Sequence, residues 1–95
     1  MKHAYSAEAL LDLQRLHDFI AAENPAAAGH AARELLDGIR GLRHFPRMGK
    51  RVSTAPGQLA PEEIRDWFTG DYIVRYLILE GQLIILRVWH GKEER

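Results

Sequence analysis

Hydrophobic residues recur at helical spacing along the first part of the chain. Four of them follow one another at intervals of four, three and four residues: Ala9, Leu13, Leu16 and Ile20. This spacing places side chains on one face of an α-helix. Ser6 precedes the stripe as a helix N-cap, Glu8 stands in the favourable first turn, and Asp12, Arg15 and Asp18 lie off the stripe. The pattern predicts an amphipathic helix that begins after Ser6.

A second helix is expected to follow directly. Asn24 and Pro25 end the first helix and begin the next, because Asn is a strong N-cap and Pro suits the first helical position. Apolar residues then recur at alternating spacings of four and three: Ala28, Ala32, Leu35, Ile39 and Leu42. The pattern stops at Phe45-Pro46, and three internal glycines are expected to fray or bend its last two turns. So short a connection requires antiparallel helices.

The period changes to two after an irregular stretch. Residues 46–61 carry three prolines and two glycines among polar residues, which is typical of a connection built from turns. Beyond it, alternation predicts three strands in a meander, at 63–67, 72–79 and 82–90, with a turn at Glu80-Gly81. A short extended segment at 3–5 precedes the first helix.

The strand predicted at 72–79 is apolar on both faces. Tyr72, Val74, Tyr76 and Ile78 point one way, and the alternate residues point the other way: Ile73, Arg75, Leu77 and Leu79. The helical hairpin can cover one face, and the pattern leaves open which one. Nothing else in the chain is long enough to cover the other face. A partner, a second copy of the chain, or a strongly twisted sheet curling round its own core would bury it.

Composition places the chain among ordinary globular proteins. Its 95 residues, 10.8 kDa, 46% hydrophobic and 27% charged, indicate one domain, residues 1–95. The absence of Cys excludes disulfides and thiolate chemistry and fits a reducing cytosol. No apolar run is long enough for a signal peptide or a membrane span. We therefore expect a soluble cytoplasmic protein with no membrane contact.

The net charge is zero, but it is unevenly distributed. It amounts to −3 over residues 1–39, +5 over 40–61 and −2 over 62–95. The basic middle stretch can contact phosphate, or it can simply be a solvated loop. Because the whole chain is neutral, the long-range attraction that drives non-specific nucleic-acid binding is weak.

Few patterns indicate catalysis. The five histidines lack metal-ligand spacing, and there is neither a phosphate-binding glycine loop nor a Gly-x-Ser-x-Gly motif, so no metal or cofactor is expected. A group of cationic residues remains near the predicted sheet: Arg65, Arg75, Arg87, His90 and Lys92. Metal-free RNA cleavage needs a base, an acid and cations, roles that His90 and the arginines can fill. Salt bridges to Asp66 or Asp71 explain the arginines equally well.

The order of several short motifs resembles a known family. The motifs are Ser-Ala-Glu-Ala-Leu-Leu-Asp-Leu at 6–13, Asn-Pro-Ala-Ala at 24–27, Ile-Arg-Gly-Leu-Arg-His-Phe-Pro-Arg-Met-Gly at 39–49, Ile-Arg at 64–65, Tyr-Ile-Val-Arg-Tyr at 72–76 and Ile-Ile-Leu-Arg-Val-Trp-His-Gly-Lys at 84–92. Together they span nearly the whole chain and look like the RelE/ParE superfamily, the toxic halves of type II toxin-antitoxin pairs. The resemblance implies an α+β fold, β-α-α-β-β-β, with the helical hairpin on a small, twisted, largely antiparallel sheet. It also implies an antitoxin whose segment folds onto the uncovered sheet face and the groove beside it.

The superfamily divides by target. RelE-like members cut mRNA in the ribosome, whereas ParE-like members poison DNA gyrase and are not nucleases. This sequence leans to ParE, a plasmid stabilisation protein, because Ile73 and Gly91 stand where RNA-cleaving members often have a basic residue and a Tyr. His90 alone matches the catalytic histidine position of some of those nucleases. Neutral charge also favours a protein target over RNA.

We therefore expect a gyrase-binding toxin that is not an enzyme and is neutralised by a cognate antitoxin. Two alternatives remain. One is a ribosome-dependent mRNA endonuclease that uses His90, Arg65, Arg75 and Arg87, the only alternative with direct nucleic-acid binding. The other is a non-toxic module that only holds its partner. The residues expected to contact target or antitoxin are Arg65, Tyr72, Arg75, Tyr76, Arg87, Trp89, His90 and Lys92.

Overall fold

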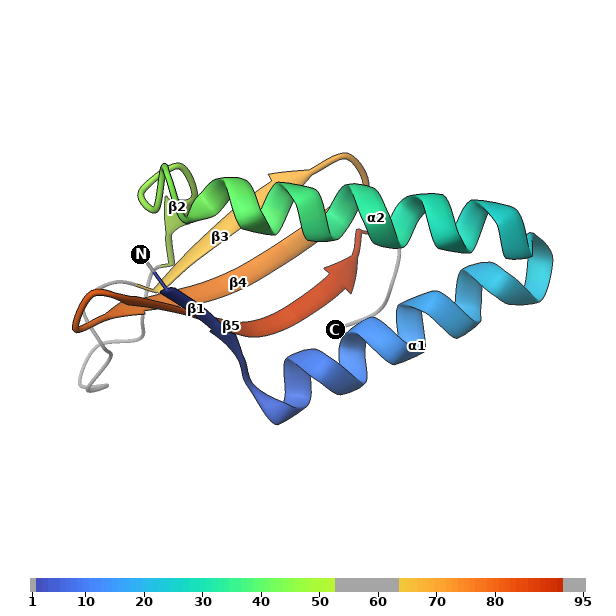
Figure 1. Cartoon of the computed structure of the whole chain (residues 1–95), viewed down its shortest axis with the longest axis horizontal. Coiled ribbons are helices and arrows are strands. Elements are labelled where there is room, and N and C mark those ends of the chain that lie inside the picture. Colours follow the sequence, from blue (N-terminus) through green and yellow to red (C-terminus); the bar gives the residue numbers. More distant parts are fainter. Residues whose placement is uncertain (1, 53–63, 92–95) are drawn as a thin grey trace.

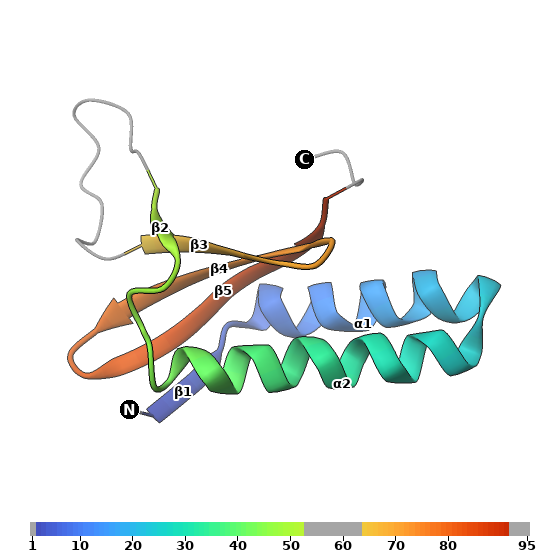
Figure 2. The same ribbon diagram turned by 90° about the horizontal axis from the view of Figure 1, so that it is seen from above.

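A helical hairpin lies on one side of a five-stranded sheet. The computed structural model describes residues 2–52 and 64–91. In chain order the elements are β1 (Lys2–Tyr5), α1 (Ala7–Glu23), α2 (Pro25–Leu42), β2 (Lys50–Arg51), β3 (Ile64–Thr69), β4 (Tyr72–Leu79) and β5 (Gln82–His90). The two helices run antiparallel (Figure 1) and form a layer beneath the sheet (Figure 2).

The sheet is mixed, with strand order β1-β5-β4-β3-β2. β1 pairs in parallel with β5, and the other pairs are antiparallel, so β3, β4 and β5 form the expected meander. The bounds of β4 and β5 agree with the sequence pattern. β2 was not expected: two residues of the stretch predicted as irregular, Lys50 and Arg51, pair with Asp66 and Arg65 of β3. Two residues are too few to produce a readable alternation.

Both helices begin at the N-caps that the sequence indicates. The Ser6 hydroxyl accepts a hydrogen bond from the Ala9 amide at 3.0 Å, and the Asn24 side chain accepts one from the Ala27 amide at 3.1 Å. Each cap satisfies an amide that the first turn of a helix leaves unpaired.

The expected fraying at the end of α2 is not observed, because the helix continues to Leu42. Close packing explains why residue 38 is a glycine. The Trp67 indole of β3 lies against the helix, and a Cβ at position 38 would be 2.5 Å from Trp67 Cη2. A side chain here would push the helix away from the sheet.

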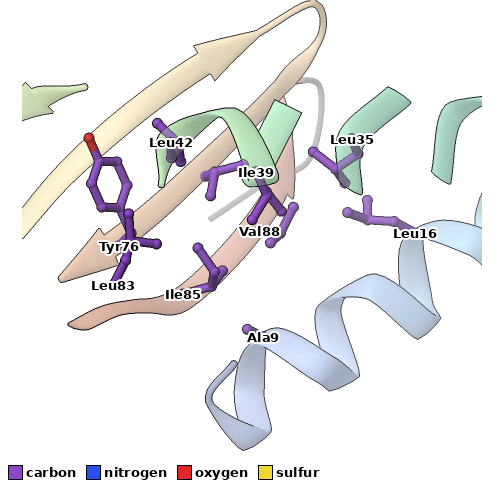
Figure 3. Packing of buried hydrophobic residues seen from close by; sticks show 10 residues of the cluster. Ala9, Leu16, Leu35, Ile39, Leu42, Tyr76, Leu83, Ile85 and Val88 are labelled. Carbon is purple, nitrogen blue, oxygen red and sulfur yellow. The ribbon is translucent and has the colours of Figure 1, made fainter. Parts of the chain in front are cut away.

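The core forms between the hairpin and one face of the sheet (Figure 3). Its buried members from the helices are Ala9, Leu16, Leu35, Ile39 and Leu42, and those from the sheet are Val74, Tyr76, Leu83, Ile85 and Val88. The helices therefore take the face of β4 that carries Tyr72, Val74, Tyr76 and Ile78, which settles a point that the sequence pattern left open.

The opposite face of the sheet, called here the open face, is covered by no element within residues 2–52 and 64–91 (Figure 2). Register and alternation assign its residues: Ile64, Asp66 and Phe68 on β3, Ile73, Arg75, Leu77 and Leu79 on β4, and Ile84, Arg87 and Trp89 on β5. Ile73 and Leu77 are nearly buried within this face, whereas Phe68 and Leu79 are exposed. Within the described residues, the sheet thus has one face packed against the helices and one partly apolar face that no element covers.

Candidate functional site

The edge of β5 is closed by helix α1 beyond the end of β1. Arg75 pairs with Arg87 but Tyr76 pairs with Ile85, so Leu86 is the extra residue of a β-bulge. β1 ends at Tyr5, and from there Ser6 continues the pairing: its amide donates to the Ile85 carbonyl at 2.8 Å and its hydroxyl to the Leu86 carbonyl at 2.8 Å. Backbone groups that would otherwise face solvent at a sheet edge are paired here.

Asp12 completes this closure six residues later, in α1. Its Oδ2 accepts hydrogen bonds from the Val88 amide at 2.9 Å and from Arg87 Nε at 2.7 Å, and its Oδ1 accepts from Arg87 Nη2 at 3.1 Å and from Arg15. Arg15 also donates to the Val88 carbonyl at 3.3 Å. The residue is only 2% exposed. Burial acts to raise the pKa of Asp12, but the hydrogen bonds from Arg87, Val88 and Arg15 outweigh it and lower the pKa below its usual value.

A second ion pair lies on the open face. Arg75 Nε and Nη2 donate to the two carboxylate oxygens of Asp66 at 2.8 and 3.0 Å, a bidentate pair that raises the pKa of Arg75. The guanidinium groups of Arg75 and Arg87 both lie over the Trp89 ring, 5.1 and 5.4 Å from its centre. Arg75, Arg87 and Trp89 therefore form one cluster, in which each arginine also binds an aspartate.

His90 lies on the other side of the sheet. It follows Val88 by two residues and pairs with Tyr72, whose side chain packs against the core. The two rings meet edge to face, with centres 5.3 Å apart. Because successive side chains of a strand point to opposite faces, the sheet separates His90 from Arg87 and Trp89.

Arg65 and Tyr76 hold the turn that follows α2. The Tyr76 ring is fully buried in the core, and its hydroxyl donates to the Pro46 carbonyl at 2.6 Å and accepts from the Gly49 amide at 3.0 Å. Figure 3 shows that hydroxyl at the margin of the apolar cluster. Arg65 Nη1 donates to the Gly49 carbonyl at 2.7 Å and to the Arg47 carbonyl at 3.3 Å. Both side chains fix backbone positions.

Comparison with known proteins decides the family. The model of the family described as "ParE toxin of type II toxin-antitoxin system, parDE" matches residues 4–95. The chain belongs to the ParE toxin family. Toxin RelE1 of Caulobacter vibrioides is 28% identical over 90 residues, covering 95% of this chain and 92% of that protein. The solved chromosomal ParDE system from P. aeruginosa has the same fold, with 18% identity, 97% of each chain covered and a TM-score of 0.74.

This ParE-family chain is therefore the toxin of a type II toxin-antitoxin system, which implies a cognate antitoxin. Across the two described ranges, no three His, Asp or Glu side chains gather as a metal site would require, and no helix is long and apolar enough to cross a bilayer.

The expected contact residues of this ParE-family toxin do not form one site. Arg75, Arg87 and Trp89 come together on the open face, Tyr72 and His90 meet on the helix side, and Arg65 and Tyr76 hold the turn. Lys92 lies outside the described residues. Tyr76 has no exposed surface with which to touch a partner in this structure. Contact of the others with target or antitoxin stays a prediction.

Sequence reasoning missed Asp12. Asp12 lies off the apolar stripe of its helix, so nothing near it in the sequence indicates that it is buried. Its partners Arg87 and Val88 lie 75 and 76 residues further along the chain.

Proposed function

We propose that this ParE-family toxin arrests growth by binding DNA gyrase, and that it is not a ribonuclease. The observation that carries the proposal is the division of the candidate RNA-cleaving residues between the two sides of the sheet. His90 lies with Tyr72 on the helix side, whereas Arg75 and Arg87 lie on the open face. Metal-free RNA cleavage requires an acid, a base and cations around one phosphate. His90 and the two arginines contact different sides of the sheet, an arrangement that does not favour joint action on one phosphate.

The state of the arginines also supports a protein target. Arg75 and Arg87 are each bound by an aspartate through two hydrogen bonds, so a phosphate would have to compete with Asp66 and Asp12. The formal net charge of the chain is zero, which removes the general attraction for ribosomal RNA.

A supercoiling assay with purified gyrase tests this proposal. We expect the toxin to inhibit gyrase, and we expect His90→Ala to inhibit it and arrest growth as the native chain does. Primer extension on cellular mRNA should show no new ends. Unaffected gyrase, with mRNA cuts that vanish in His90→Ala, would instead establish the endonuclease. Harmless expression with a stable antitoxin complex would establish the non-toxic binding module.

We further propose that the antitoxin covers the open face. This face combines exposed apolar side chains, Phe68 and Leu79, with the cluster of Trp89 and two arginines. Burying apolar surface returns about 25 cal/mol per Å², and Trp and Arg dominate the energetics of protein interfaces. A segment that orders on binding needs many such contacts to offset its lost freedom.

The chain offers a matched pair of variants for this interface. Phe68 is 59% exposed on the open face, and Phe19 is 65% exposed on α1. Phe68→Ser should weaken antitoxin binding at least about tenfold, whereas Phe19→Ser should leave it unchanged. Hydrogen exchange on the purified complex should show antitoxin-dependent protection within residues 72–90. Protection confined to residues 46–61 would contradict this placement.

A further inference from the structure

The turn that follows α2 presents two apolar side chains to solvent. Phe45 is 69% exposed and Met48 is 49% exposed, and the Met48 amide donates to the Phe45 carbonyl at 3.0 Å, so the two residues begin and end one tight turn. With Pro46 and Arg47 they line a shallow surface hollow. We call residues 45–48 the Phe45–Met48 turn.

This turn is held rigidly from below. The buried Tyr76 hydroxyl binds the Pro46 carbonyl and the Gly49 amide, and Arg65 binds the carbonyls of Arg47 and Gly49. The approach is so close that a Cβ at position 49 would lie 2.8 Å from the Tyr76 hydroxyl oxygen. Two exposed apolar side chains are thus displayed on a fixed backbone. Such preorganisation lowers the entropy cost of binding a partner.

The surroundings of the turn are basic. Residues 40–51, which the structure describes, contain five Lys and Arg and no acid, a net charge of +5 within a neutral chain. Long-range attraction therefore favours an acidic partner at this place.

The composition of the turn favours a protein over a nucleic acid. Its sequence is Phe-Pro-Arg-Met, and aromatic residues, Met and Arg are the types enriched in protein interfaces. The turn also lies beside β2, at the opposite edge of the sheet from β1, and it contacts Tyr76, a residue of the helix-facing side. It is therefore separate from the open face.

We propose that the Phe45–Met48 turn is the surface through which the toxin holds its protein target. The two apolar side chains enter a hollow in the target, and an acidic segment of the target faces the basic residues around the turn. This inference rests on the proposed function, because it requires that the toxin act by binding a protein.

The experiment compares the double variant Phe45→Ser/Met48→Ser with Phe19→Ser, which removes an equally exposed phenylalanine elsewhere. Both are purified with the antitoxin and separated from it, and their affinities for purified gyrase and for the antitoxin are measured. We expect the double variant to lose at least about tenfold in gyrase affinity and in growth arrest, with antitoxin affinity unchanged. Phe19→Ser should match the native chain in all three measurements.

A charge variant tests the turn independently, because it leaves Phe45 and Met48 unchanged. Lys50 is exposed on β2, next to the turn, but it pairs with Asp66 and so lies at the edge of the open face, and the antitoxin affinity of this variant is therefore measured as well. Lys50→Glu should weaken gyrase binding several-fold at low salt, and the difference from the native chain should shrink as salt is raised. Thermal unfolding of every variant shows whether the fold is kept, and Lys50→Glu decides the matter if the double variant does not fold.

Three results would overturn the inference. One is native gyrase affinity and growth arrest in both the double variant and Lys50→Glu. Another is a loss of antitoxin affinity while gyrase binding persists, which would assign the turn to the antitoxin. The third is growth arrest through mRNA cuts that the double variant no longer makes, which would assign the turn to RNA.

If the native toxin leaves gyrase unaffected, the proposed function fails. The turn is then judged by growth arrest alone, and native arrest in the double variant refutes it.

Discussion

The two faces of β4 both carry apolar side chains, but they pack them in different ways. On the helix side, Val74 and Tyr76 are fully buried against apolar residues of α1 and α2. On the open face, Arg75 stands between the nearly buried Ile73 and Leu77, and binds Asp66 and the Trp89 ring. One face is stabilised by apolar packing against the helices, whereas the other combines the nearly buried Ile73 and Leu77 with an ion pair and leaves Phe68 and Leu79 exposed.

This difference separates stability from recognition. Surface arginine pairs contribute little to stability, since an exposed pair is worth about 0–1 kcal/mol. Trp and Arg side chains are nevertheless the strongest contributors to protein interfaces. Substitutions of buried residues on the helix side should therefore change folding, and substitutions of exposed residues on the open face, such as Phe68 and Leu79, should change binding.

The largest contrast is expected between two adjacent isoleucines of β5. Ile85 is fully buried under the helices, whereas Ile84 is partly exposed on the open face. Ile85→Ala should lower the free energy of unfolding by about 4 kcal/mol because it leaves a cavity, and Ile84→Ala by about 1 kcal/mol. Urea denaturation of both variants measures the difference. Equal losses would mean that the open face is packed as tightly as the core.

Substitution of Asp12 tests whether the ion pair at the β5 edge contributes as much to stability as a core residue or as little as a surface ion pair. Asp12→Ala leaves the Val88 amide and Arg87 without their acceptor, so we expect a loss of about 3 kcal/mol. Asp18→Ala, an exposed change on the same helix, should stay within about 0.5 kcal/mol. A loss at Asp12 no larger than that at Asp18 would show that the closure of this edge is not important for stability.

The Tyr76 hydroxyl makes a smaller contribution. Tyr76→Phe keeps the buried ring but removes the partner of the Pro46 carbonyl and the Gly49 amide. We expect a loss of about 1–2 kcal/mol in denaturation. Hydrogen exchange at residues 47–49 should increase while the helices stay protected. Uniform loss of protection across the chain would contradict a role confined to the turn.

Acid should affect the ion-paired edge and not the apolar core. The folded pKa of Asp12 lies below its ordinary value of 3.8, so its charge contributes stability above about pH 3.8, and this contribution disappears as the pH falls through the lowered pKa. The stability gap between the native chain and Asp12→Asn should be constant near neutrality and narrow below pH 3.8. Denaturation series at several pH values measure it. A gap that persists at the lowest pH would contradict this assignment.

Local signals account for what the sequence predicted correctly. Ser6 and Asn24 are helix caps whose function depends on amides three residues away, and the alternation along β4 reflects the two faces of one strand. Such features are readable because both partners lie within one element.

The features that the sequence did not predict all involve distant partners. Asp12 is buried only because Arg87 and Val88 arrive from β5, and β2 exists only because β3 offers an edge for two residues. Whether Tyr76 points to a partner or to the core depended on which face the helices take. The alternation of side chains along β5 places His90 and Arg87 on opposite sides of the sheet. The ion pairs that Arg75 and Arg87 make with Asp66 and Asp12, however, are visible only in the structure.

The position of β5 in the sheet determines when the fold can form during synthesis. β5 is made after every other described element, yet it lies between β1 and β4, and Lys2 pairs with Gln82 across 80 residues of chain. Contacts so distant in sequence are made late and slowly. Until residues 82–90 are available, α1 has no sheet to cover and Asp12 has no arginine from β5. A nascent chain that stops short of β5 therefore carries the helical hairpin without its core, and the toxin takes its folded form only after residues 82–90 have been made.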